Sequence, residues 1–242
     1  MGLIRVVALT AAVASPLPAQ VTPPWGVHDT LRPRPRIVSV REMPSDAIVL
    51  FDGRNLSEWR SAQGGAAPWR VRDGFVEVVP RSGDIETARR FGDVQVHIEW
   101  ATPAEVSGKG QQRGNSGVFL MGMYELQILD SYENRTYADG QAGAIYGQHP
   151  PLVNASRSPG KWQSYDIVFR RPRFDSAGVL TSPARMTVLH NQVLVHHNVE
   201  LLGATAHGRL AAYTAHADRL PIKLQDHGNR TRFRNIWVRE IE

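Results

Sequence analysis

Cysteine is absent from the 242 residues of this sequence. Its absence excludes disulfide bonds, thiolate nucleophiles and cysteine-ligated metals. Beyond the N-terminus no apolar run is long enough to cross a bilayer, so no transmembrane segment is expected. A domain of this length can bury a core that holds the fold without covalent cross-links.

Several further patterns are missing. Long segments of helical periodicity are absent, which argues against helical and doubly wound folds. The basic residues give a net charge of +5 but are scattered, without a dense run or interleaved aromatics. A nucleic-acid surface is therefore not expected. Walker, Rossmann and G-x-S-x-G motifs are also absent, which leaves nucleotide chemistry and serine hydrolysis without support.

The N-terminus has the pattern of an export signal. Arg5 precedes the apolar run 6–13, and the small-residue sequence LPA ends at Ala19. The alternative is a buried strand of the domain. We interpret residues 1–19 as a signal peptide, which predicts a secreted or periplasmic protein. Residues 20–45 are rich in Pro and Arg and indicate an extended leader, so the folded domain is expected over 46–242.

From residue 47 onward, short alternating segments are separated by turn residues. The clearest is 94–100, where Val94, Val96, Ile98 and Trp100 alternate with polar side chains. Further strands are expected at 118–130, 164–169, 184–190, 222–227 and 233–241, and a hairpin turn at 191–192. Many short strands without a βαβ rhythm predict an all-β, two-sheet antiparallel sandwich.

Two of these strands present an unusual polar face. Strand parity places Glu125 with Gln127, and Gln225 with His227, opposite the apolar residues of each strand. Each strand thus offers a titratable group and an amide two residues apart, a pattern that suits sugar hydroxyls. The alternative is that Glu125 lies on a solvated face and His227 is structural.

Glycine-rich segments at 114–117 and 137–149 also combine amides, hydroxyls and aromatic rings. Tyr146, Trp69, Trp162 and Trp237 are candidates to stack on a sugar ring, although parity favours a core position for Trp162 and Trp237. Asn115, Asp130, Asp226 and Asn229 are equally compatible with turns.

No metal motif of fixed spacing is present, since His196 and His197 point to opposite faces of a strand. Glu125, Asp130 and His227 could still gather a divalent cation from separate strands. The sequence names no certain cofactor and carries no signal for oligomeric state.

Ordered motifs along residues 47–241 resemble the 3-keto-disaccharide hydrolase domain family. They are LFDGRNLSEW (50–59), WRVRDG (69–74), RGNSGVF (113–119), YELQILDSY (124–132), DGQAGAIYG (139–147), WQSYD (162–166), PARMTVLHN (183–191), LQDHGN (224–229) and FRNIWVR (233–239).

The resemblance implies a concanavalin-like jelly-roll sandwich that is secreted or periplasmic, and a glycosyl hydrolase acting on glycosides oxidised to a ketone at C3. It also implies a pocket whose candidate residues are Glu125, His227, Asn115, Gln127, Asp130, Tyr146 and Gln148, and strand parity adds Gln225.

A C3 ketone acidifies the C2 proton, so a base can remove it and the C1 oxygen can leave by β-elimination. Glu125 or His227 is the expected base, with Gln127 and Asn115 as hydrogen-bonding groups. A bound cation could polarise the ketone instead.

Two other functions compete with this one. The first is a non-catalytic, lectin-like carbohydrate-binding module, because the sandwich fold does not imply catalysis. The second is an ordinary two-carboxylate glycosidase, which needs Asp130 or Glu99 beside Glu125; strand parity argues against both.

Overall fold

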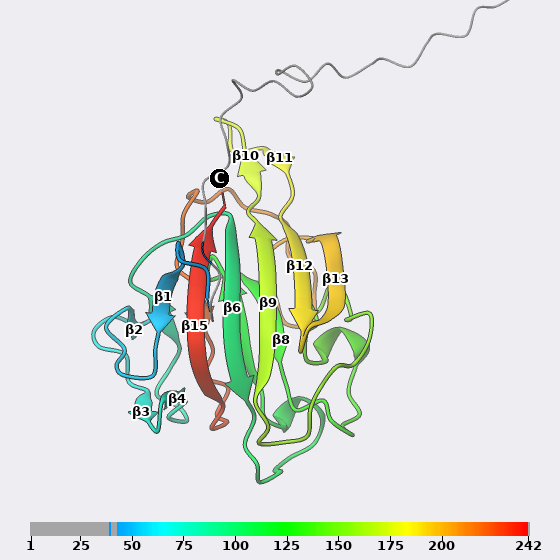
Figure 1. Cartoon of the computed structure of the whole chain (residues 1–242). Helices are drawn as coiled ribbons and strands as arrows, with labels where there is room; N and C mark the ends of the chain where they lie inside the picture. The colour runs from blue at the N-terminus through cyan, green and yellow to red at the C-terminus, as the bar shows by residue number, and fades with distance from the viewer. Residues whose placement is uncertain (1–38, 40–42, 242) are drawn as a thin grey trace, which may run out of the picture. The chain divides into compact units, whose positions relative to one another are not determined.

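The computed structural model describes residue 39 and residues 43–241, so the predicted signal peptide and most of the leader lie outside the described residues. The described chain is almost entirely β-structure with antiparallel pairing (Figure 1). Its strands are β1 (Ile48–Phe51), β2 (Trp59–Ser61), β3 (Arg70–Arg72), β4 (Phe75–Glu77), β5 (Ile85–Thr87), β6 (Val94–Ala101), β7 (Ser116–Leu120), β8 (Tyr124–Ile128), β9 (Gln163–Arg170), β10 (Arg173–Phe174), β11 (Leu180–Ser182), β12 (Arg185–His190), β13 (Val193–Glu200), β14 (Lys223–Leu224) and β15 (Arg232–Glu240). Two short 3₁₀ helices, η1 (Gly110–Gln112) and η2 (Ala138–Gly140), lie in the loops.

Two sheets form the sandwich. An eight-stranded sheet has the order β13-β12-β9-β6-β15-β4-β3, with β1 also paired to β15. A five-stranded sheet has the order β2-β5-β14-β7-β8. Neighbouring strands are far apart in sequence, as in β6 between β15 and β9, and this crossing-over is the jelly-roll arrangement that the sequence predicts.

Alternation along the strands builds the core between the sheets. In β6, Val94, Val96, Ile98 and Trp100 are all buried, and the polar residues between them are only partly covered. From the smaller sheet, β8 contributes Tyr124, Leu126 and Ile128 to the same cluster of apolar side chains. The predicted parity of both strands is confirmed.

Some predicted details are corrected. The single strand expected over 118–130 is a hairpin, because Met121 and Gly122 adopt positive φ of 54° and 68° and reverse the chain between β7 and β8. Trp162 is half-buried instead of lying in the core, with the guanidinium of Arg234 4.2 Å from its ring centre. Trp237 is buried, but it stacks on His97 at 5.4 Å between ring centres, on the face of β6 opposite Val96 and Ile98, and so lies outside the core cluster.

The predicted turn at 191–192 is confirmed. Asn191 and Gln192 both have positive φ, 50° and 68°, and His190 pairs with Val193 on either side of them. Two successive left-handed residues are the geometry of a type I′ hairpin turn.

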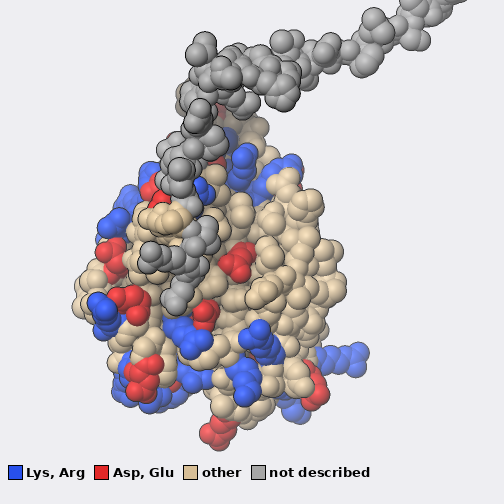
Figure 2. All heavy atoms as spheres, viewed as in Figure 1, with Lys and Arg blue, Asp and Glu red and all other residues tan. Residues whose placement is uncertain are grey.

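The outer face of the eight-stranded sheet is the face seen in Figures 1 and 2. Positive and negative side chains are interspersed over β15 and β6, and uncharged side chains dominate over β12 and β13 (Figure 2). No helix among the described residues has the length and apolar character needed to span a membrane.

Candidate functional site

The candidate site lies on the outer face of the five-stranded sheet. A cavity of about 270 Å³ is lined by Phe119, Glu125 and Gln127 from the β7–β8 hairpin, Asn115 before it, Gln225 and His227 after β14, and Tyr146, Thr205, Ala206 and His207 from two loops. Six of the predicted site residues therefore converge on one cavity: Asn115, Glu125, Gln127, Tyr146, Gln225 and His227.

Loops convert this outer face into a buried one. All five residues of β8 are buried, and Glu125 and Gln127 are only 5% and 1% exposed. The backbone of residues 143–146 hydrogen bonds to the free edge of β8, as in Tyr146 N to Glu125 O at 3.2 Å. Thr205 covers the same edge by accepting the Glu125 N–H at 3.0 Å.

Successive side chains of β8 thus point alternately into the core and into the cavity, and neither face of this strand is exposed to solvent.

Glu125 occupies the floor of the cavity. Its carboxyl lies above Gly117 of β7, where a Cβ atom would stand 2.6 Å from Glu125 Oε1, so only glycine leaves room for it. The pKa of Glu125 is raised to about 8, mainly by burial; the Lys223 charge acts against this shift, and the nearby Asp84 charge adds to it. A carboxyl with such a pKa can exchange a proton near neutral pH.

Charged side chains surround Glu125 along a cross-strand row. Glu125 pairs with Phe119, and Phe119 with Lys223 of β14. The Lys223 ammonium lies 4.2 Å from the Phe119 ring centre and 2.9 Å from Asp84 Oδ2. A positive and a negative charge are therefore held next to the cavity. Sequence reasoning missed both, because Lys223 lies on β14 and Asp84 directly precedes β5, and only the pairing of these strands brings the two side chains together.

Gln127 is held by protein groups. In one orientation its amide nitrogen donates to Gln111 Oε1 at 2.8 Å. In the other, the nitrogen donates to Glu125 Oε1 at 3.2 Å and to the Ser116 carbonyl at 2.9 Å. Asn115 Nδ2 donates a hydrogen bond to the backbone carbonyl of Gln111, which belongs to η1, at 2.7 Å. Gln127 and Asn115 thus belong to one amide network above the carboxyl.

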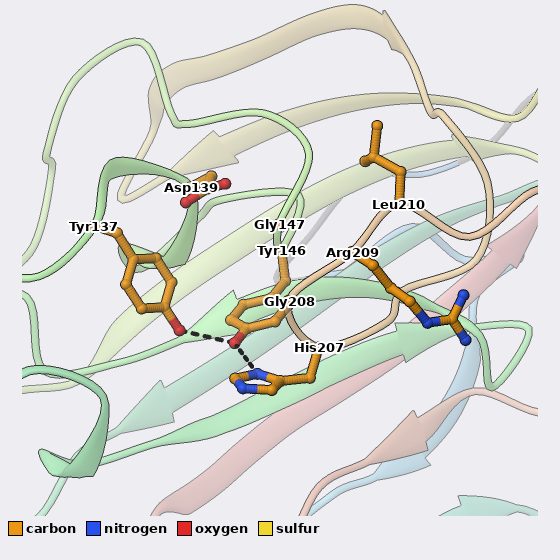
Figure 3. Close-up of a pocket in the computed structure, with 8 residues that line it drawn as sticks. All are labelled: Tyr137, Asp139, Tyr146, Gly147, His207, Gly208, Arg209 and Leu210. Atoms are coloured by element: carbon orange, nitrogen blue, oxygen red, sulfur yellow. Dashed lines mark hydrogen bonds between the residues drawn. The ribbon is translucent and has the colours of Figure 1, made fainter.

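Tyr146 forms the wall of the cavity nearest the loops. Its hydroxyl is 2.8 Å from the Tyr137 hydroxyl and 3.1 Å from His207 Nδ1, and the three rings converge in Figure 3. Burial raises the pKa of Tyr146, and the Tyr137 hydrogen bond and the charges of Glu125 and Asp139 add to it. Tyr146 therefore keeps its proton and can donate it in a hydrogen bond. His207 was not predicted, because its loop carries no recognisable motif.

Asp130 and Gln148 do not line this cavity, contrary to expectation. Asp130 is 3% exposed, forms an ion pair with Arg113 at 2.5 Å, and accepts from Tyr132 N at 3.2 Å. It faces a different hollow because β8 ends before it. Gln148 accepts from Leu202 N at 2.7 Å and donates to Gly203 O at 3.0 Å, so it ties two loops together.

The proposed cation trio of Glu125, Asp130 and His227 is accordingly not assembled. Across residues 43–241, no three histidine or acidic side chains gather as a metal-binding group. Glu99, the other candidate second carboxylate, hydrogen bonds to Arg234 and Asn235 on the eight-stranded sheet. Neither Asp130 nor Glu99 stands beside Glu125, so the geometry of a two-carboxylate glycosidase is not formed with them.

Known proteins share sequence and fold with this chain. The family model described as the 3-keto-alpha-glucoside-1,2-lyase-like domain matches residues 46–239. A 3-keto-disaccharide hydrolase of Bacteroides thetaiotaomicron is 22% identical over an alignment of 261 positions, which covers 83% of this chain and 81% of that protein.

Among solved structures, a "putative glycosyl hydrolase" of Parabacteroides distasonis has a TM-score of 0.85 and 44% identity, covering 88% of this chain and 95% of its own. A second one from that organism has a TM-score of 0.58 and 17% identity, covering 81% of this chain and 94% of its own, and shares the fold.

Proposed function

Because the chain belongs to the 3-keto-alpha-glucoside-1,2-lyase-like domain family and is a carbohydrate-active, hydrolase-like protein, we propose that it cleaves 3-keto-glycosides by β-elimination followed by hydration. The observation that carries this proposal is the buried Glu125 carboxyl, on the floor of a cavity and surrounded by amides, with a pKa of about 8. Such a group is a stronger base than an exposed carboxylate once ionised.

In the proposed reaction, the Glu125 carboxylate removes the C2 proton and the electron pair forms the C3 enolate. The enolate re-forms the ketone, a C1–C2 double bond appears, and the C1–O bond breaks with its electrons going to the departing oxygen. That oxygen takes a proton and leaves as an alcohol. Water then adds across the C1–C2 double bond, with the proton returning to C2 and the hydroxyl to C1, so the net change is hydrolysis.

The other cavity residues can stabilise the negative charges that develop on the enolate oxygen and on the departing oxygen. The Asn115 and Gln225 amides can donate to the enolate oxygen, which is the role of an oxyanion hole. The Tyr146 hydroxyl keeps its proton and can donate to the departing oxygen. His227 is exposed at the rim, whereas the Glu125 carboxyl lies on the cavity floor, so Glu125 is the better-placed base of the two predicted candidates.

The first test separates chemistry from binding. The purified protein is mixed with a 3-keto-disaccharide or its unoxidised parent in D₂O, and both sugar release and deuterium at C2 are followed. Release should occur from the keto-sugar alone. Glu125→Gln should lower turnover by about a thousandfold and abolish C2 exchange while retaining sugar affinity, because the amide still hydrogen bonds but cannot accept the proton.

His227→Asn is the matched control, and it should retain C2 exchange. If both sugars bind but neither is cleaved, the protein is the lectin-like module instead. If His227→Asn alone abolishes exchange, His227 is the base.

The proposal includes export from the cytoplasm, supported by the charge, apolar run and LPA sequence of residues 1–19. Mass spectrometry of protein recovered from periplasm and medium should find an N-terminus near Gln20. Recovery only from cytoplasm with Met1 intact would contradict export.

A further inference from the structure

A second cavity adjoins the first. It has a volume of about 410 Å³ and is lined by Tyr137 and Asp139 around η2, Tyr146 and Gly147, and the 207–210 segment (Figure 3). Tyr146 and His207 line both cavities, so their hydrogen-bonded side chains form the partition between them. A ligand that reaches Glu125 past Tyr146 and extends beyond one ring therefore enters the second cavity.

The second cavity exposes an apolar surface and two charged side chains. Tyr137 is 45% exposed and Leu210 is 59% exposed, which leaves an apolar surface in a hollow. Among the described residues, the side chains of Asp139 and Arg209 make no hydrogen bond or ion pair. An acceptor-only carboxylate, a donor-only guanidinium and an apolar wall are together suited to a neutral ring that carries hydroxyls on its edge.

The walls are also held in place. Gln148 hydrogen bonds to Leu202 N and Gly203 O, which ties the Tyr146 loop to the segment that carries His207 and Arg209. Thr205 in the same segment is bound to the β7–β8 hairpin through Met123 O at 2.9 Å. The second cavity is thus built on the same framework as Glu125.

We propose that the second cavity binds the leaving group of the substrate, and that this leaving group is a neutral sugar ring. The inference rests on the proposed function, since it assigns the first cavity to the 3-keto ring. Tyr146 then lies at the glycosidic oxygen, between the two rings. Asp139 would accept from hydroxyls of the second ring, Arg209 would donate to them, and Tyr137 and Leu210 would cover its C–H face.

The test compares substrates that differ only in the leaving group: a 3-keto-disaccharide, the methyl 3-keto-glycoside and the 4-nitrophenyl 3-keto-glycoside. The variants are Arg209→Ala and Leu210→Ala, both at exposed positions where truncation leaves the core intact. Arg54→Ala is the control, because its side chain is 84% exposed and lines neither cavity.

We expect each variant to lower kcat/KM for the disaccharide by about five- to tenfold and to change the methyl glycoside by less than about twofold. Equal losses on both substrates, or no loss on either, would overturn the proposal. A loss confined to the nitrophenyl glycoside would also overturn it, because the cavity would then bind an aromatic leaving group.

If the wild-type protein cleaves none of the three substrates, the proposed function fails. Calorimetry with the unoxidised disaccharide and with its monosaccharide then tests whether the second cavity binds a sugar ring. Tighter binding of the disaccharide that both variants abolish supports a second sugar position. Equal affinity for the two sugars, or a difference that both variants retain, rejects it.

Discussion

At the scale of single residues, the chemistry depends on how neighbours set the proton affinity of Glu125. Burial disfavours its charge, Asp84 adds repulsion, and Lys223 offers the one opposing attraction among the causes of the shift. Lys223 and Asp84 are themselves paired at 2.9 Å, so each modulates the effect of the other. The pKa of Glu125 is thus raised mainly by burial and adjusted by two opposing charges that the amide network does not include.

Lys223→Met and Asp84→Asn should move the pH profile in opposite directions. The Glu125 base must be ionised, so wild-type kcat/KM should rise with pH and level off above about 8. Loss of the Lys223 charge raises the pKa and moves the midpoint up by about one pH unit, whereas loss of the Asp84 charge moves it down. Arg60→Met is the control, because Arg60 pairs with Glu86 in the same cross-strand row but farther from the cavity. Shifts of the same sign in both variants would contradict this account.

At the scale of elements, the β7–β8 hairpin positions the site. Gly117 lies opposite Gln127 and beside Glu125, and it has no side chain where the carboxyl needs space. The neighbouring strand β14 is shorter than the expected 222–227, because the Asp226 N–H is taken by Asp84 Oδ1 at 2.9 Å and Gly228 N by Asp226 Oδ1 at 2.8 Å. That turn sends His227 to the rim.

Gly117→Ala should impair catalysis while the fold remains. The new methyl group would stand 2.6 Å from Glu125 Oε1 and 2.9 Å from a Phe119 ring carbon, so the carboxyl must move. We expect kcat/KM to fall at least about tenfold, because small misplacement of a reacting group is costly. When Gly117→Ala is added to the Glu125→Gln variant, it should have little further effect on turnover. Comparing the two single variants with the double variant measures this coupling. Full activity of a folded Gly117→Ala protein would show that the carboxyl position is not critical.

At the scale of the whole molecule, the buried side chain of His190 links folding to pH. His190 is fully buried, stacks on Trp100, meets the Tyr165 ring edge-on, and hydrogen bonds through Nε2 to Gln163 Oε1 at 2.8 Å. Its Nδ1 makes no hydrogen bond within the described residues. Burial lowers the pKa of His190 to about 4, and the Arg157 charge adds to this effect.

His190→Phe should make folding less sensitive to acid. The unfolded chain takes up the His190 proton near pH 6.5 and the folded chain near 4, so its contribution is fully present above 6.5 and is lost as pH falls toward 4. The full loss is about 3 kcal/mol. Glu125 acts with opposite sign between 4.5 and about 8, so the difference between variant and wild type is the informative quantity. Urea unfolding at pH 7 and pH 4.5 measures it, and equal pH dependence of the two proteins would contradict the prediction.

The sequence by itself determined the sandwich and the faces of its strands. Alternation is a local property with a period of two residues, so the positions of Val94, Trp100, Leu126 and Glu125 follow from neighbours in the chain. The type I′ turn at 191–192 was equally local. These features predict fold class and most of one cavity wall.

Only the tertiary structure decided which residues line the cavity and how deeply Glu125 is buried. Burial of Glu125 comes from loops some 20 and 80 residues farther along the chain, through Tyr146 and Thr205. In the same packing, Asp130 forms an ion pair with Arg113 and lies outside the cavity. His207 lies between the two cavities and lines both. Such contacts join segments distant in sequence, and a single sequence does not encode their distances locally. The pKa that makes Glu125 a candidate base is therefore a property of the assembled fold.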